Sequence, residues 1–392
     1  MGADGGAVVE DTDRVAHASA ARDGVTIGQT VLFTGLLAFT CCALLSAPTP
    51  ALACAVVGLQ AIFVLTSVWR FTLAIASLAP IPQTPALDRW PRYTILAALH
   101  DEADVAPQLI GNLSRLDYPE HRLEGFLVLE AHDAATLAAI EATPRPAWLH
   151  VMIAPPGAPQ TKPRALNFAL SRASGALLTI YDAEDAPDPG QLREAASRFM
   201  HDPELGCLQA PLRIRDRSHL PRSGFLDRQF ALEYASLFEV TLRGMARLGL
   251  PFPLGGTSNH IRVSALRQAG GWDAYNVTED ADLGFRLWRN GWRLGVIARP
   301  TLETPPGGFD RWLPQRTRWL KGYMQTWGVH TRQPLGLGAR GLAAFVMTVG
   351  MGIVSALAHA PALAWLTAAV LIGLSSGLSP GVPIPSVGVM LL

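Results

Sequence analysis

Charged side chains occupy only part of this sequence of 392 residues. No Asp, Glu, Lys or Arg occurs from Gly24 to Trp69, and none occurs after Arg340. All 32 basic and all 32 acidic residues therefore lie within 1–23 and 70–340. Charge is costly in hydrocarbon, whereas a soluble domain carries charge on its surface. The pattern predicts a soluble domain held between two membrane segments.

The composition excludes several classes of protein. Hydrophobic residues make up 49% of the chain and the formal net charge is zero, which argues against intrinsic disorder. The same charge balance leaves no basic excess with which to bind nucleic acid. Of the four cysteines, Cys41, Cys42 and Cys54 fall in apolar runs, so Cys207 has no partner outside them for a disulfide.

Two apolar runs, 25–47 and 51–69, each reach the ~20 residues that cross a bilayer. The prolines between them predict a tight turn, and hence a helical hairpin within 25–79. A cleaved signal peptide explains the first run less well, because acidic residues outnumber basic ones in the tail before it, 1–24. The C-terminal part, 335–392, offers two more spans, 341–360 and 361–378. Its apolar ending is also compatible with a truncated chain and further spans.

Basic residues near the ends of the predicted spans indicate the orientation. Arg70, Arg89 and Arg92 follow the second span, Arg332 and Arg340 precede the third, and the turn at 48–50 has none. Lys and Arg accumulate on the cytoplasmic side of membrane proteins. We therefore expect a cytoplasmic domain in a multi-pass protein of a bacterial-type inner (plasma) membrane.

Within the soluble block, short apolar runs alternate with stretches of helical character. Strands are expected at 93–99, 125–130, 149–154 and 176–181, and helices at 102–116, 134–142, 162–174 and 189–201. This alternation favours an α/β domain with a mostly parallel sheet. Ligands bind beyond the carboxyl ends of such strands. Three of these ends carry carboxylates: Asp101 with Glu102, Asp133, and the group Asp182, Glu184 and Asp185.

Two acidic clusters are candidates for chemistry. Asp182 and Glu184 suit a hard divalent cation bound to phosphate oxygens, although helix capping would also explain acids here. Glu279 and Asp280 precede a predicted helix at 283–289, where they either stabilise its first turn or supply a general base. Which carboxylate of the first cluster reaches a metal stays open, because Asp185 is adjacent.

Aromatic residues recur at helical spacing near the second membrane segment. They are Trp312, Trp319, Tyr323 and Trp327. This spacing predicts an amphipathic helix at 307–334 that lies at the membrane surface. Arg318 on this helix is a candidate to bind phosphate.

Taken in order, these motifs resemble those of processive family-2 glycosyltransferases, the membrane-embedded synthases of cellulose, hyaluronan and chitin. The family pattern is a strand-end acid, a D-x-D, a T-E-D and a Q-x-x-R-W. It is matched here by Asp133, Asp182–Glu184, Thr278–Asp280 and Gln315–Trp319. The resemblance implies a GT-A glycosyltransferase domain at 90–306, flanked by transmembrane helices. Glu184 departs from the pattern, since it stands where the second Asp of D-x-D is usual.

The resemblance also implies a role for each matching position. A UDP-sugar donor would be bound by Asp101, Glu102, Asp133, Lys162, Asp182, Gln315 and Arg318. Asp182 and Glu184 would hold Mg²⁺ or Mn²⁺, and Asp280 would be the catalytic base. The acceptor would be contacted by Gly256, Thr257, Glu279 and Trp319.

On this resemblance we expect an inverting hexosyltransferase that extends an envelope or exopolysaccharide through β-linkages. Its expected partners are a UDP-sugar, a saccharide or lipid-linked acceptor, membrane lipids, and export or regulatory proteins, with no nucleic acid. Two alternatives stay open. One is a non-processive enzyme that adds one sugar to a lipid carrier. The other is a catalytically silent subunit with the same fold, against which the carboxylates at all expected positions argue.

Overall fold

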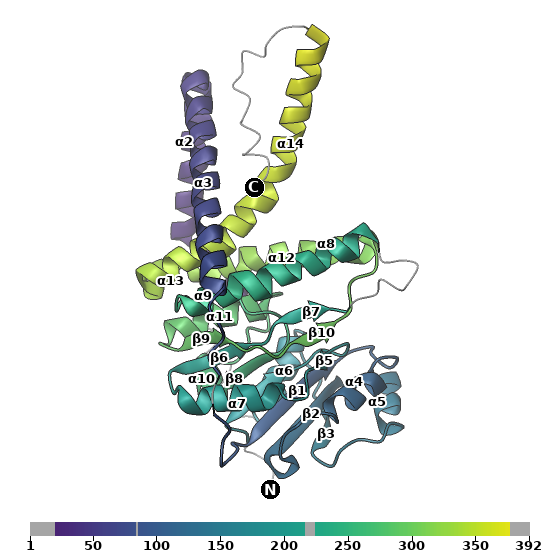
Figure 1. Cartoon of the computed structure of the whole chain (residues 1–392). Coiled ribbons are helices and arrows are strands. Elements are labelled where there is room, and N and C mark those ends of the chain that lie inside the picture. Colours follow the sequence, from purple (N-terminus) through teal and green to yellow (C-terminus); the bar gives the residue numbers. More distant parts are fainter. Residues whose placement is uncertain (1–19, 84, 216–223, 377–392) are drawn as a thin grey trace.

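The computed structural model describes residues 20–83, 85–215 and 224–376. An α/β domain forms the base of the molecule, two long helices lie across it, and apolar helices rise from the same side (Figure 1). Residues 1–19 of the predicted N-terminal tail and 377–392 of the predicted C-terminal segment lie outside the described residues.

The centre of the α/β domain is a seven-stranded sheet in the order β3-β2-β1-β4-β8-β6-β9. Its paired strands are parallel except at β8, which runs antiparallel to both β4 and β6. The expected mostly parallel sheet is thus confirmed. Apolar residues from most of these strands belong to two buried clusters. They are β1 (Tyr93–Leu99), β2 (Leu123–Glu130), β3 (Leu149–Ala154), β4 (Leu177–Ile180), β6 (Leu205–Gln209), β8 (Asn259–Arg262) and β9 (Arg293–Val296).

Helices connect and cover these strands. They are α4 (Ala106–Leu113), α5 (Ala134–Glu141), α6 (Lys162–Leu170), α7 (Gln191–His201), α10 (Val263–Gln268) and α11 (Glu279–Arg289). The helix predicted at 102–116 begins only at Ala106. Pro107 lies in its first turn, where a missing N–H costs nothing.

A smaller sheet in the order β5-β10-β7 lies between the large sheet and the long helices (Figure 1). Its strands are β5 (Ala186–Pro187), β7 (Leu212–Ile214) and β10 (Thr301–Glu303). This sheet was not predicted, because its strands are only two or three residues long.

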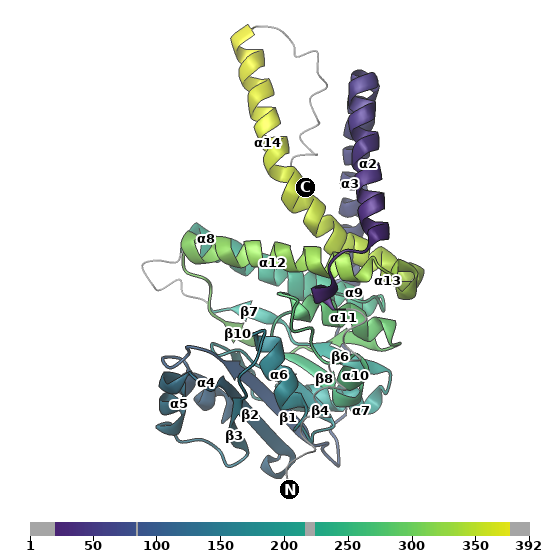
Figure 2. The ribbon, with the colours of Figure 1, turned by 180° about the vertical axis from the view of Figure 1, so that it is seen from behind.

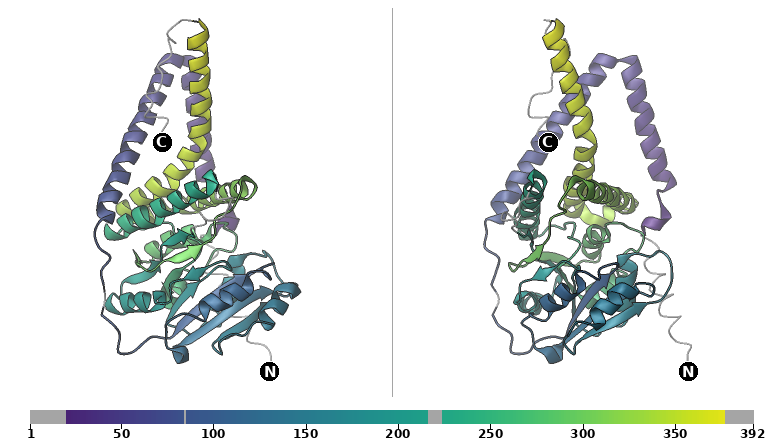
Figure 3. Two further views of the ribbon diagram at one scale, coloured as in Figure 1. Left: turned by 45° about the vertical axis from the view of Figure 1, so that its right-hand side comes forward. Right: turned by 90° about the vertical axis from the view of Figure 1, so that its right-hand side faces the viewer.

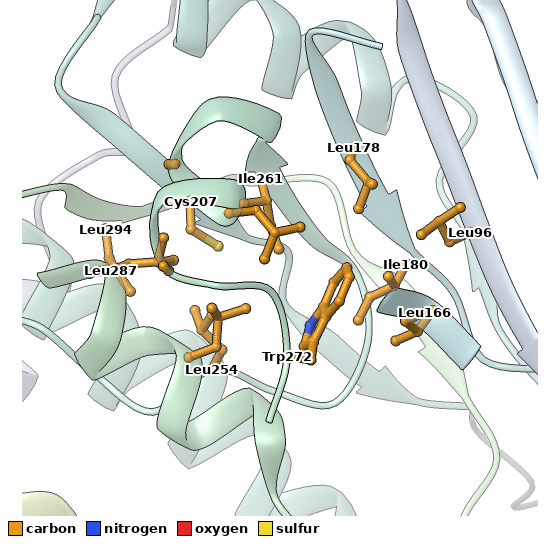
Figure 4. Packing of buried hydrophobic residues seen from close by; sticks show 14 of the residues in the cluster. Leu96, Leu166, Leu178, Ile180, Cys207, Leu254, Ile261, Trp272, Leu287 and Leu294 are labelled. Atoms are coloured by element: carbon orange, nitrogen blue, oxygen red, sulfur yellow. The ribbon is translucent and has the colours of Figure 1, made fainter. Parts of the chain in front are cut away.

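The main core lies between the large sheet and the helices toward the membrane side. Trp272, Ile180 and Ile261 meet at its centre, with Leu254 and Leu287 alongside (Figure 4). Cys207 belongs to this core as a buried free thiol, as expected. The core fixes β4 against the loop that leads into α11, and both segments carry predicted site residues.

Three helical stretches of the described residues are long and apolar enough to span a membrane: Ile27–Ser46, Pro48–Ser77 and Pro334–Ala358. The first two are α2 and α3 of the predicted hairpin. Together with α14 (Met351–Ser376) they rise from one side of the molecule (Figure 3). Two spans are expected after Arg340, and the structure describes this region as far as residue 376. In that part, α13 (Gly338–Phe345), a π-helical stretch (Val346–Gly350) and α14 follow without a break, and α14 continues through Pro361.

Two long helices separate the α/β domain from the apolar helices (Figures 1 and 2). One is α12 (Phe309–His330), which falls within the predicted amphipathic segment. The other begins as α8 (Phe225–Tyr234) and continues through a π-helical stretch (Ala235–Leu242) into α9 (Arg243–Arg247). Both carry large exposed apolar side chains, among them Phe225, Leu232, Phe309 and Leu313.

Candidate functional site

A cavity of about 1010 Å³ lies between the carboxyl end of β4 and the long helices. Its wall is formed by the turn after β4, the start of α6, the loop before α11, and parts of α12 and α14. The cavity brings together ten of the predicted site residues: Lys162, Asp182, Glu184, Gly256, Thr257, Glu279, Asp280, Gln315, Arg318 and Trp319. Residues far apart in the sequence thus share one space.

The three carboxylates in the turn after β4 have different environments. Asp185 is fully buried and accepts hydrogen bonds from the Asp182 amide, at 2.8 Å, and from the Thr257 hydroxyl. Burial raises the pKa of Asp185, and nearby Asp182 raises it further. Asp185 therefore shapes the turn, whereas the side chains of Asp182 and Glu184 are accessible.

Lys162, the first residue of α6, lines the cavity between its two acidic clusters. Its Nζ donates to Asp182 Oδ1 and, at 2.8 Å, to the carbonyl of Gly256. Burial alone would lower the pKa of Lys162, but Asp182 and Glu279 outweigh burial and raise it. The ammonium group is therefore charged and faces both acidic clusters.

Glu279 and Asp280 form the first turn of α11. Burial raises the pKa of Glu279 to about 7, with a further contribution from Asp280. Burial also raises the pKa of Asp280, although Lys162 and Arg318 act in the opposite direction. Gly256 adjoins this acid, since a Cβ on Gly256 would lie 3.4 Å from Asp280 Oδ2. The loop therefore leaves room for a ligand to approach Asp280 closely.

The far wall of the cavity comes from α12. Arg318 is exposed and donates to the carbonyl of Val277 at 3.2 Å. Trp319 packs against Phe230 and Tyr234 of α8, with ring centroids 6.4 Å apart in both pairs. The Oε1 atom of Gln315 is buried, and no residue of the described part hydrogen-bonds to it. This wall thus offers the exposed cation of Arg318, the aromatic ring of Trp319 and the amide of Gln315.

Asp101, Glu102 and Asp133 do not line the cavity. Asp133 is 5% exposed and accepts hydrogen bonds from the amides of Asp101, at 2.8 Å, and Thr136, at 3.1 Å. It therefore caps α5 and holds Asp101 in a left-handed conformation, φ 57°. Burial raises the pKa of Glu102, and Glu184 and Asp182 contribute, so this strand end adjoins the acidic turn.

The donor set of the acidic turn fits a hard divalent cation. Asp182 and Glu184 offer carboxylate oxygens, the ligands that Mg²⁺ and Mn²⁺ prefer. Burial and the charge of Asp182 raise the pKa of Glu184, so a cation here would relieve repulsion. A second group, His100, Asp101 and Asp133, has donor atoms within 4.8 Å of one another. It fits less well, because Asp133 already accepts two backbone N–H groups.

Several lining residues were missed from the sequence. Glu303 at the end of β10 is a further carboxylate of the cavity, and burial, with Asp185 and Asp182, raises its pKa well above the usual range. Tyr234, Phe238 and Arg316 also line the cavity. Nothing in the sequence marks Glu303 or α8, whereas Arg316 lies inside the recognised Gln315–Trp319 motif.

Comparisons with known proteins identify the family of the chain. Residues 177–385 match the family described as glycosyl transferase family group 2. The beta-monoglucosyldiacylglycerol synthase of Synechocystis sp. (strain ATCC 27184 / PCC 6803 / Kazusa) is 26% identical over 255 residues, which are 63% of this chain and 52% of that protein. Cellulose synthase 1 of Komagataeibacter xylinus is 24% identical over 277 residues, 69% of this chain and 17% of that protein. The chain thus spans about half the length of these curated relatives, or less.

Among solved structures, the mannosyltransferase PcManGT of Pyrobaculum calidifontis, in complex with GDP-Man and Mn²⁺, superposes with a TM-score of 0.61 at 21% sequence identity. The alignment covers 86% of this chain and 95% of that protein, which confirms the expected GT-A fold. The family match covers more than half of the chain and includes the turn after β4, α11 and α12. The chain therefore belongs to glycosyl transferase family group 2 and is a glycosyltransferase.

Proposed function

We propose that this glycosyltransferase moves a sugar from a cytosolic UDP-sugar to a growing envelope polysaccharide, with inversion to a β-linkage. The observation that carries the proposal is the shared cavity. It joins the acidic turn after β4, the acids at the start of α11 and the Gln315–Trp319 segment of α12. An in-line displacement requires a base on one side of the anomeric carbon and a neutralised leaving group on the other.

Asp280 is the proposed catalytic base. Burial raises the pKa of its carboxyl, which makes the carboxylate a better proton acceptor near neutral pH. Its neighbour Gly256 has no side chain to obstruct an acceptor hydroxyl. Glu279, Gly256 and Thr257 orient the acceptor, and Trp319 supports its sugar ring.

The leaving nucleoside diphosphate would be held opposite the base. Lys162, Arg318 and Gln315 provide donors to phosphate oxygens, since all three line the cavity. Asp182 and Glu184 would hold Mg²⁺ or Mn²⁺, which when bound neutralises charge on the diphosphate. Asp101, Glu102 and Asp133 at the adjoining strand ends would bind the nucleoside.

The catalytic domain would lie on the cytoplasmic side of a membrane and would contact the lipids of that membrane. Arg70, Arg89 and Arg92 at the end of the hairpin and Arg332 and Arg340 before the next span support this orientation. The catalytic site would then face the cytosol, where nucleotide sugars are available.

Transfer of one sugar to a lipid carrier is the second candidate. It is favoured by one observation: the cavity extends to Gly352 and Ala356 of α14. These residues belong to a stretch that could span a membrane. An acceptor with an apolar tail could therefore approach Asp280 from the membrane. A growing polymer could also leave the cavity along this route.

Release of UDP by the purified full chain tests the proposal. UDP-glucose, UDP-N-acetylglucosamine, UDP-galactose and UDP-glucuronate are offered singly with Mg²⁺ or Mn²⁺. We expect release with one donor, loss of release on chelation, and a fall of at least ~10²-fold in Asp280→Asn. Long products would support the polysaccharide synthase, and single-sugar lipid products the second candidate. Release that Asp280→Asn leaves unchanged would overturn the assignment of the base.

A further inference from the structure

Arg316, the second residue of the Gln315–Trp319 segment, is enclosed by partners that the sequence does not reveal. Its guanidinium forms an ion pair with Glu233 of α8. The guanidinium carbon also lies 4.7 Å from the ring centroid of Trp319, 5.3 Å from that of Phe230 and 5.4 Å from that of Trp312. One side chain thus contacts an acid and three aromatic rings from two helices.

This arrangement connects the two long helices at the cavity wall. Phe230 and Glu233 belong to α8, whereas Trp312, Arg316 and Trp319 belong to α12. Phe230 is 2% exposed, so it is a fixed support and not a surface that a ligand could reach. Because Trp319 also packs against Phe230, at 6.4 Å, movement of Arg316 would change the position of the indole.

The two arginines of the segment differ in their charge environment. Arg316 is paired with Glu233, and 26% of its side chain is exposed. Arg318 is exposed and donates a hydrogen bond to the backbone carbonyl of Val277. Because a carbonyl does not neutralise the guanidinium, its positive charge stays available to phosphate. A single arginine would thus suffice for the leaving group, and Arg316 requires another explanation.

We propose that Arg316 is a positioning residue that holds the indole of Trp319 at the acceptor end of the cavity, with Glu233 and Phe230 as its supports. The inference rests on the proposed function, in which Trp319 supports the acceptor sugar. Arginine suits this role because its planar guanidinium stacks on aromatic rings while it pairs with a carboxylate. A lysine at this position keeps the charge but loses the planar stacking.

The first test monitors the indole directly and needs no activity. The full chain is labelled with 5-fluorotryptophan, and the ¹⁹F signal of Trp319 is assigned by its loss in Trp319→Phe. In Arg316→Met we expect this signal to shift and broaden, with partial recovery in Arg316→Lys. Arg311→Met is the matched control, since Arg311 is an exposed arginine of the same helix outside the cavity wall. An unchanged Trp319 signal in Arg316→Met would overturn the inference.

The second test separates positioning from phosphate binding. Arg316→Met should lower UDP release about tenfold while the affinity for UDP stays within about twofold. In a Trp319→Ala background the same change should have no additional effect, because Arg316 acts through Trp319. Reduced UDP affinity in Arg316→Met, or a further loss of UDP release when both substitutions are combined, would contradict the inference.

If Trp319→Ala itself has wild-type activity, the proposed role of Trp319 in acceptor binding fails. The fluorine signal distinguishes this outcome from the case in which Arg316 does not position Trp319. Glu233→Gln is a second variant should Arg316→Met not fold.

Discussion

The acids at the start of α11 are adjacent in the chain, but burial distinguishes them from ordinary surface carboxylates. Burial raises the pKa of both groups, and that of Glu279 reaches about 7. Two such neighbours lose their protons in coupled steps. A base within this pair is therefore protonated, and inactive, at a higher pH than an isolated aspartate would be.

Replacing Glu279 should leave the acid side of the pH–rate profile in place. The charge of Asp280 contributes to the pKa of about 7 of Glu279, so Glu279 is still protonated while Asp280 loses its proton. In Glu279→Gln we therefore expect the acid limb to stay where it is in the wild type. The measurement is UDP release between pH 5 and 9. An acid limb that moves toward lower pH would show that Glu279 ionises before Asp280.

The residues of the cavity could be predicted where they follow strands or match motifs, and not where their role depends on tertiary partners. Asp182 and Asp280 were predicted from position and pattern. That Asp185 faces inward could not be predicted, because its partner Thr257 is 72 residues away in the chain. Likewise, Asp133 caps α5 through the nearby Thr136 amide, but its second contact, with the Asp101 amide 32 residues away in the chain, could not be predicted.

At the scale of elements, α11 and α12 are in direct contact behind the proposed base. Gly322 of α12 is buried against Thr278, and a Cβ at Gly322 would overlap with that side chain. Asn276 also donates to the Thr326 hydroxyl at 3.0 Å. The position of the loop that leads into α11, and hence of Glu279 and Asp280 in the first turn, therefore depends on a close approach of α12.

Gly322→Ala should separate these elements. We expect a loss of about 1–3 kcal/mol in the free energy of unfolding, together with reduced UDP release. Gly328→Ala is the matched control, because a Cβ at Gly328 of the same helix would meet no atom within 4 Å. The control should be neutral or slightly more stable, since alanine favours helix. Equal effects of the two substitutions would argue against the contact with Thr278.

A buried ion network ties the same two helices together further along. Asp282 accepts from Arg286, at 2.6 Å, and from His330 of α12, at 3.0 Å. Burial alone would raise the pKa of Asp282, but Arg286 and His330 lower it to about 2. Its stabilising effect is complete above the unfolded value of ~3.9 and is lost as the pH falls toward 2.

Asp282→Asn should therefore destabilise the protein at neutral pH by about 3–5 kcal/mol, because Arg286 stays buried without its counter-ion. Thermal unfolding of the purified protein measures this, and the difference from the wild type should shrink below about pH 4. A difference that persists unchanged at low pH would show that the charge of Asp282 is not what stabilises the junction.

Helices and strands could be predicted where the pattern of apolar residues in the sequence is clear. The strands at 93–99 and 149–154 were correct to the residue, because apolar runs bounded by turns identify buried strands. The antiparallel direction of β8 and the existence of α8 were missed. Their form depends on partners distant in sequence, such as Trp319 and the strands β4 and β6.

At the scale of the whole molecule, the segment before the first apolar helix contacts the loop that forms part of the cavity wall. The Ala21 amide donates to Asp273 at 2.6 Å, and Arg332 donates to the carbonyls of Ala20, at 3.0 Å, and Gly24, at 2.5 Å. Figure 2 shows this segment beneath α12. The loop that follows Asp273 forms part of the cavity wall. Asp273 and Arg332 thus connect the N-terminal segment to the cavity wall and to the end of α12, and Arg22 adds a hydrogen bond to Tyr275 of the wall at 3.4 Å.

Arg332→Ala tests whether this connection matters for transfer. The substitution removes the two hydrogen bonds and the ion pair with Asp23 that Arg332 forms with the N-terminal segment, and it leaves the cavity residues unchanged. We expect UDP release to fall by about tenfold, with UDP affinity retained, because the loop at 273–277 loses its outer support. Arg340→Ala is the matched control, since Arg340 donates in the same way to the carbonyls of Leu248 and Gly249 but does not contact the N-terminal segment. If both variants keep wild-type turnover, the N-terminal segment anchors the apolar hairpin without acting on the site. If only Arg332→Ala is impaired, the N-terminal segment supports the loop at 273–277. A change in the position of that segment would then alter the rate of sugar transfer.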